Sequence, residues 1–397
     1  MPFLTGNVTF FRFAVRGARP DLFGDDHLDA LRQFAAGRSR LASADGVECG
    51  WAASGHVLDT DFTLLKNVVN DALCFDLRVD TDRLPADLLK AYYEIELKAL
   101  SASNPSGFAS AKQKREAKEA ARDRLEEEAK DGRFKKRKCI PLLWDRPSNE
   151  LLFGATSVTH VDRLCALFKQ TFDAELMPLT AGVQSRVRGD QAHARLHGEQ
   201  AGYVTAPTLS PFVEGVTPED AAWIPDGESR DFLGNEFLLW LWFNADGASD
   251  TLALPDKSDA TFMIARTLVL DCPRGQSGTD GFRHEGPTRL PEALRALRAG
   301  KLPRKCGLTL VRHDEQYEFT LHAETLSVGG CKLPKPGDDV TDARAKLDDR
   351  IDKVRHQIQT LDLLYAAFLA VRLSLAWAET LGRMQRWLSK GERREAA

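Results

Sequence analysis

Clustered cations are the residues of this chain whose types and spacing suggest a chemical role. The segment from Lys112 to Lys138 contains twelve Lys or Arg against seven Asp or Glu, a net charge of +5, in a chain of 397 residues with a net charge of −4. Cations gathered on one surface neutralise phosphates and release counterions, whatever the charge of the whole protein. The segment therefore predicts a polyanionic partner. The alternative is a solvated helix whose glutamates pair with its cations at helical spacing.

A second basic segment runs from Arg283 to Arg312, with eight Lys or Arg opposed by Glu285 and Glu292, a net charge of +6. Neither segment contains a zinc-finger pattern, an aromatic RNA-binding motif or a recognition helix that could read base edges. We therefore expect contacts to the phosphate backbone and binding that does not depend on sequence.

Candidate catalytic or metal-binding residues are few. Asp76 and Asp80 could hold Mg²⁺ in a nuclease, but no further signature accompanies them. His193 and His197 have the i, i+4 spacing of a metal pair, yet no Glu follows His193 as in the zincin motif. We expect no enzyme, no metal and no cofactor.

Composition indicates a globular protein. Hydrophobic residues make up 43% of the chain, enough for buried cores, and no apolar run approaches the length of a membrane span. The seven cysteines are widely spread without a Cys-x-x-Cys pair, which favours reduced thiols over disulfides or zinc ligands. The N-terminus lacks the pattern of a signal peptide. We expect a cytoplasmic protein without a membrane partner.

The elements that must position the cations alternate between strand and helix patterns. Strands are predicted at 8–15, 47–52, 73–79, 139–144, 151–157 and 176–179, and helices at 28–35, 85–100, 112–138 (the basic helix with its terminal basic run) and 161–172. The basic run 133–138 is expected to form a turn before the strand 139–144. The apolar run Phe237–Phe243 is predicted as a buried strand, and 308–312 with 317–322 as a hairpin. From Asp342 to about Leu388 the spacing is helical.

These patterns predict an α+β fold with antiparallel sheets and helices packed on one face. Four serial regions are expected: 1–180 with the basic helix, an irregular inserted lobe at 181–231, a strand-rich region at 232–340 with the second basic segment, and a C-terminal helical segment at 341–397.

Several landmarks in one order resemble the recombination-associated protein RdgC family of bacterial nucleoid-associated DNA-binding proteins. The resemblance covers about three quarters of the chain. Its landmarks are the strand 8–15, Gly50-Trp51, Lys112-Gln113-Lys114-Arg115, Leu142-Leu143-Trp144-Asp145, Met177-Pro178-Leu179, Leu297-Arg298-Ala299-Gly300-Lys301 and Leu333. The chain departs from shorter members in the lobe near 180–231 and in its longer helical end.

The resemblance implies an RdgC-like fold, a homodimer closed into a ring or clamp around double-stranded DNA, a nucleoid location, and restraint of RecA-driven recombination. Single-stranded DNA is a second candidate ligand. Phe134 would serve dimer closure or a buried hinge. The implied DNA contacts are Lys112, Lys114, Arg115, Lys118, Arg122, Arg133, Lys135, Lys136, Arg137, Lys138, Lys301, Arg304 and Lys305.

Two other functions stay open on the sequence alone. A Mg²⁺-dependent nuclease would need convergent carboxylates beside the basic surface. A protein-binding scaffold would use the C-terminal helix and leave the charged helix merely solvated.

Overall fold

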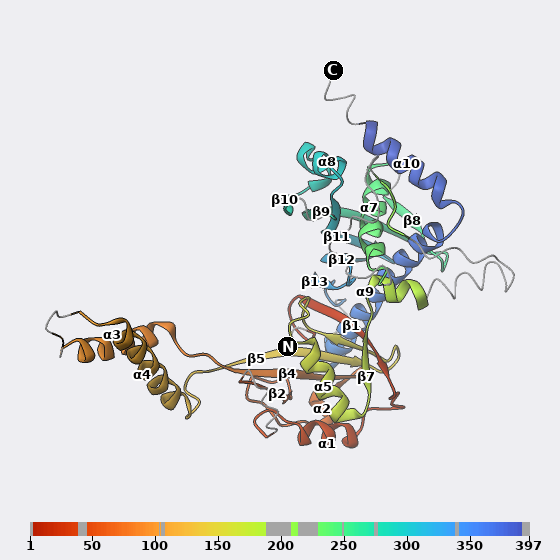
Figure 1. The fold of residues 1–397 in the computed structure, drawn as a ribbon. Helices are drawn as coiled ribbons and strands as arrows, with labels where there is room; N and C mark the ends of the chain where they lie inside the picture. The colour runs from red at the N-terminus through yellow and green to blue at the C-terminus, as the bar shows by residue number, and fades with distance from the viewer. Residues whose placement is uncertain are drawn as a thin grey trace. The chain divides into compact units, whose positions relative to one another are not determined.

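The structure of the chain is a computed structural model. It describes residues 3–38, 46–102, 104, 108–187, 208–212, 229–247, 250–273, 277–337 and 341–390. These residues form two compact units (Figure 1). The first unit comprises Met1–Phe23, Leu65–Cys74 and Pro141–Ala397, and the second comprises Gly24–Leu64 and Phe75–Ile140. The units interleave along the chain, whereas the four predicted regions run in series. Most of the predicted lobe, at 188–207 and 213–228, lies outside the described residues.

The first unit is built on an antiparallel sheet with the strand order β10-β9-β11-β12-β13-β1-β6-β5. Two further strands, β7 and β8, pair with β1 and β9, and β3 pairs with the first residues of β4. The bounds are β1 (Val8–Arg16), β3 (Val68–Val69), β4 (Ala72–Asp82), β5 (Lys135–Asp145), β6 (Glu150–Phe153), β7 (Glu175–Pro178), β8 (Thr251–Ala253), β9 (Asp259–Asp271), β10 (Asp280–His284), β11 (Leu302–Arg312), β12 (Glu315–His322) and β13 (Val328–Lys332).

Sequence-distant strands meet on β1. It pairs with β13, which lies in the C-terminal half of the chain, and with β6 and β7, which lie nearer its middle. This non-local pairing explains why the units do not follow the chain in series. The prediction of an α+β protein with antiparallel sheets is confirmed.

The predicted hairpin near residue 313 is also confirmed. β11 and β12 pair up to Arg312 opposite Glu315, and the two turn residues His313 and Asp314 have φ values of 48° and 62°. Two consecutive positive φ angles define the type I′ turn that suits a two-residue hairpin loop.

The helices of the first unit include α2 (Leu64–Asn67, at the boundary), α5 (Val161–Phe172), α7 (Phe232–Asp246), α8 (Pro291–Arg298), α9 (Ala343–Arg372) and α10 (Trp377–Lys390), with the 3₁₀ turn η3 (Pro287–Arg289). The predicted helix 161–172 is confirmed by α5, and the helical C-terminal segment by α9 and α10. Asp342 begins α9 as an N-cap, with its carboxylate accepting a hydrogen bond from the Ala345 N–H at 2.9 Å.

The strand predicted at Phe237–Phe243 is wrong, because these residues lie in α7. A continuous apolar run does not distinguish a buried strand from a helix that is buried on all sides. The helix extends beyond the run because its buried polar residues have partners. Asn235 donates to the Pro303 carbonyl at 2.9 Å, and Glu236 pairs with Arg372.

The second unit contains α1 (Asp25–Gln33), β2 (Val47–Ala52), α3 (Ala86–Ser101) and α4 (Ala111–Ala129), together with Phe75–Asp82 of β4 and the first half of β5. β4 lies between β2 and β5. Trp51 is fully buried, with its ring centroid 5.1 Å from that of Phe75. Gly50 is required here, because a Cβ atom would lie 2.5 Å from the Ala36 Cα atom.

Candidate nucleic-acid interface

The helices α3 and α4 form an antiparallel hairpin in the second unit (Figure 1). α4 begins with a capping box, in which the Gln113 N–H donates to Ser110 Oγ at 3.2 Å and the Ser110 N–H donates to Gln113 Oε1 at 2.9 Å. Its buried stripe is Ala117, Ala121 and Leu125, spaced by four residues. All other residues of α4 keep some exposure, so its cations stand on the outer surface of a defined helix.

Most cations of α4 have an acidic neighbour one turn on. The pairs are Lys112–Glu116 at 3.8 Å, Arg115–Glu119 at 3.8 Å, Arg122–Glu126 at 2.7 Å and Arg124–Glu128 at 4.0 Å. These pairs are exposed and place the cation N-terminal to the acid, the weaker of the two orders, so each contributes little to stability. The solvated-helix interpretation is thus correct for part of the helix, but pairs this weak also exchange readily for a phosphate.

Lys114 and Lys118 differ from their neighbours. Both are exposed, and within the described part of the chain neither side chain has a hydrogen bond or an ion pair. Four residues separate them, so they lie one turn apart on the same face of α4. This face offers two uncompensated cations.

The end of the hairpin differs from the prediction. Of the predicted turn 133–138, only Arg133 and Phe134 precede the strand. Lys135 to Lys138 belong to β5. Arg133 pairs with Asp131, and Phe134 is half-buried, with its carbonyl accepting from the Arg83 N–H at 3.3 Å. The four basic residues continue the pairing of a strand whose later residues are buried, which is why the chain is already extended at Lys135.

The strand sorts its cations by their alternation. Lys135 Nζ lies 2.9 Å from Glu48 Oε2, and Arg137 Nε lies 3.7 Å from Asp80 Oδ2. The side chains of Lys136 and Lys138 are exposed and have no polar partner among the described residues. Because side chains alternate along a strand, these two lie on the face opposite to the one on which Lys135 and Arg137 meet their acidic partners. Sequence reasoning gave all four lysine and arginine residues the same role, since Glu48 and Asp80 become neighbours only through the pairing of β2, β4 and β5.

The carboxylates considered for Mg²⁺ are engaged separately in β4. Asp76 Oδ1 accepts from Ser54 Oγ at 2.7 Å, and burial raises the pKa of Asp76 above its usual value. Asp80 forms a bidentate pair with Arg78 at 2.9 and 2.8 Å. Across the described ranges, no group of three or more His, Cys, Asp or Glu side chains could hold a metal ion. His193 and His197 lie outside those ranges.

The neighbouring thiol of Cys139 is also poorly suited to ionise. Burial, with the charge of Asp76, raises the pKa of Cys139 to about 12. All seven cysteines are free, as expected, and none is exposed.

The second basic segment lies in the first unit, and its central cations are structural. Lys301 is 8% exposed, with Nζ donating to the Gly278 carbonyl and to Asp280 Oδ2, both at 2.6 Å. Arg304 pairs with Asp271 at 3.0 Å and with Glu324 at 2.6 Å. Folding thus brings distant acids against both side chains, so the charges of Lys301 and Arg304, which we expected to contact DNA, are already compensated within the first unit.

Lys305 is the exception in that stretch. It is half-buried, has no ion pair within the described residues, and stands opposite His322 in the register of β11 and β12. Burial, with Lys305 as the next cause, lowers the pKa of His322 to about 4. Lys305 thus acts on a neighbouring imidazole as an uncompensated charge.

No single helix in the described part of the chain is long and apolar enough to cross a membrane; α9 and α10 meet that test only as a pair, bent by 101°. Comparison with protein-family models and with curated protein sequences found no match for this chain.

Proposed function

We propose that this chain is a sequence-independent DNA-binding protein whose second unit contacts the phosphate backbone. The contacts come from the outer face of α4 and from the solvent-facing side of the first residues of β5. Duplex DNA is the ligand, and the implied role is that of a homodimer that encloses DNA and restrains RecA-dependent recombination.

The observation that carries the proposal is a set of exposed cations without an acidic partner among the described residues: Lys114 and Lys118 on α4, and Lys136 and Lys138 on β5. A protein that only needs solubility gains little from holding like charges at fixed helix and strand positions, since they repel one another. Phosphates remove this repulsion, and release of their counterions supplies the free energy of binding.

The weak pairs along α4 support the same function. Lys112 and Arg115 lie 3.8 Å from their glutamates with 87% and 86% of their side chains exposed. Little free energy is lost when such a side chain turns to a phosphate instead. The glutamates would in turn limit the affinity, which favours a protein that exchanges between sites on DNA.

The dimer, the nucleoid location and the effect on RecA rest on the resemblance in the sequence. Phe134, half-buried at the junction of α4 and β5, remains the proposed dimer contact.

A salt series tests the proposal. Binding of a labelled duplex of about 30 base pairs is measured by fluorescence anisotropy between roughly 50 and 300 mM NaCl, with unrelated sequences as competitors. Four to eight phosphate contacts give a log K against log[salt] slope of about −4 to −7, and competitors of equal length should differ by no more than a few-fold. A slope near zero, or a strong preference for one sequence, would contradict the proposal.

A further inference from the structure

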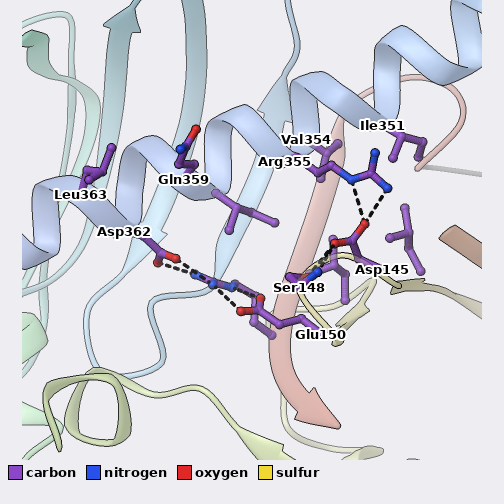
Figure 2. Close-up of a pocket in the computed structure, with 13 residues that line it drawn as sticks. Asp145, Ser148, Glu150, Ile351, Val354, Arg355, Gln359, Asp362 and Leu363 are labelled. Carbon is purple, nitrogen blue, oxygen red and sulfur yellow. Dashed lines mark hydrogen bonds and ion pairs between the residues drawn. The ribbon is translucent and has the colours of Figure 1, made fainter. Parts of the chain in front are cut away.

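A cavity of about 300 Å³ lies in the first unit between α9 and the strands β1, β5 and β6 (Figure 2). Its apolar walls are Leu143 and Leu152 from the strands and Ile351, Val354, Ile358 and Leu363 from the helix. The first four of these side chains belong to the buried core of the unit, and the other two are half-buried and pack against that core. The cavity therefore reaches into the hydrophobic core and is not only a hollow of the polar surface.

One side of the cavity wall carries Arg12, which is 2% exposed. Its guanidinium donates to both oxygens of Glu150, at 2.9 and 3.0 Å, and to both oxygens of Asp362, at 2.7 and 3.0 Å. Burial by itself lowers the pKa of Arg12, but the two carboxylates outweigh burial and raise the pKa above its usual value. Arg12 therefore stays charged, and two carboxylates of the same wall compensate its charge.

The second guanidinium of the wall, that of Arg355, is paired in the same way. Its Nε donates to Asp145 Oδ1 at 2.8 Å, and its other nitrogens bond to Asp352 and to the Asn70 carbonyl. Asp145 Oδ2 accepts a further bond from Ser148 Oγ at 2.7 Å. The charged groups around the cavity are thus bonded to one another and to neighbouring groups of the same unit.

This pairing of charges decides which ligands the cavity favours. A charged ligand would compete for partners that are already bonded, and removal of one partner from a buried ion pair leaves the other charge buried and uncompensated. An uncharged apolar ligand leaves every pair intact and covers the aliphatic side chains of Ile351, Val354 and Leu363. The cavity therefore favours an uncharged ligand over a charged one.

The volume of the cavity sets the size of the ligand. An apolar cavity of about 150 Å³ holds one benzene molecule, so a space of about 300 Å³ admits a substituted benzene or two fused rings. An unfilled cavity lowers the stability of a fold in proportion to its volume. A ligand that fills the space and binds only the folded state should therefore also raise the melting temperature.

We propose that this cavity binds a small uncharged apolar molecule, a substituted benzene or a compound of two fused rings, against the aliphatic side chains of α9, β5 and β6. This site lies in a different unit from the proposed DNA contacts, and its occupancy does not depend on them.

The test uses ligand-detected NMR on the full chain with three probes that share one benzene ring: toluene, which is uncharged, benzylamine, which is a cation, and benzoate, which is an anion. Saturation transfer should be strong for toluene and weak for both charged probes. No transfer to toluene up to its solubility limit, or transfer to either charged probe equal to that of toluene, would overturn the proposal.

A filling variant separates the cavity from general adsorption of toluene to apolar surface. Ile358→Trp puts a larger side chain into the space and should abolish both the saturation transfer to toluene and the rise in melting temperature that toluene causes. Ala370→Trp adds the same indole at an exposed position about three turns further along α9 and should leave both unchanged. Full binding in a folded Ile358→Trp variant, or an equal loss in both variants, would refute the proposed site.

An enlarging variant keeps the site testable if Ile358→Trp does not fold. Ile358→Ala widens the cavity, so binding of naphthalene relative to toluene should increase over that of the unaltered chain. A ratio of naphthalene to toluene binding that does not change in a folded Ile358→Ala variant would contradict the proposal, because the ligands would then lie elsewhere.

Discussion

The cations of β5 alternate between two faces of the strand, so mutations can test the two faces separately. We compare Lys136→Ala with Lys138→Ala, the face without acidic partners, against Lys135→Ala with Arg137→Ala, the face that meets Glu48 and Asp80. Both double variants remove two positive charges from the same four residues. Net charge and position in the chain are therefore matched, and the main difference is the availability of the charges.

The expected effect on DNA binding follows from counting phosphates. Each lost contact to duplex DNA lowers the salt slope by about 0.9, so the Lys136/Lys138 variant should lose about 1.8 units of slope. The Lys135/Arg137 variant should lose well under one unit, because those two cations are already neutralised. Affinity of the Lys136/Lys138 variant should fall about uniformly across unrelated duplexes, since phosphate contacts carry no sequence information.

The two double variants should affect stability in the opposite order, with the larger loss in the Lys135/Arg137 variant. Exposed cations without partners change the free energy of unfolding by about 0.5 kcal/mol or less. The paired face is more sensitive: Asp80 is 4% exposed and keeps Arg78 as a partner when Arg137 is removed, so we expect a loss of about 1 kcal/mol. Urea denaturation measures both values.

Anisotropy titrations at four or more salt concentrations decide the result. If both double variants lose the same slope, the sorting of cations by strand face is irrelevant to binding. If neither loses any, β5 is only a charged edge, and the contacts must be sought on α4. If the Lys136/Lys138 variant unfolds, the assumption that its side chains are solvated is incorrect.

Three further predictions concern other cations and one imidazole. Lys114→Ala with Lys118→Ala should also reduce the salt slope by about 1.8 while the helix content in circular dichroism stays the same, since both side chains are exposed on α4; an unchanged slope would remove this face from the interface. Lys301→Ala should lower the free energy of unfolding by roughly 1–3 kcal/mol without changing the salt slope, because it removes two buried hydrogen bonds rather than a DNA contact, whereas Lys305→Ala should leave stability nearly unchanged. His322 has a pKa of about 4 in the folded state against about 6.5 when unfolded, so the unfolded state binds the extra proton and stability should fall as pH drops from 6.5 to 4; His322→Gln should flatten that part of a pH series of denaturation curves, and an unaltered pH dependence would contradict the shift.

Sequence patterns predicted correctly those elements whose formation depends on residues close together in the chain. The helical spacing after Pro85 and the hairpin pattern around His313-Asp314 both predicted elements that the structure contains. The excess of cations between Lys112 and Lys138 was likewise visible in the sequence. These features depend on neighbours within a few residues, for which propensity, capping and turn chemistry act directly.

Patterns were insufficient where the outcome depends on distant partners. The run around Trp240 lies in a helix that packs against β9, β11, α9 and α10, and a helix buried on all sides has no periodicity that separates it from a buried strand. The buried ion pairs of Arg12 gave no sequence signal either, because its partners Glu150 and Asp362 are 138 and 350 residues away along the chain.

The sequence by itself determined that this protein has an α+β fold and carries two concentrations of positive charge. Only the tertiary structure decided which of these charges stay available. Lys301 is enclosed by Gly278 and Asp280, while Lys136 and Lys138 face solvent. The physical reason is that a charge is neutralised by whichever group folding places within a few ångströms, and that distance is set by strand pairing and not by separation along the chain.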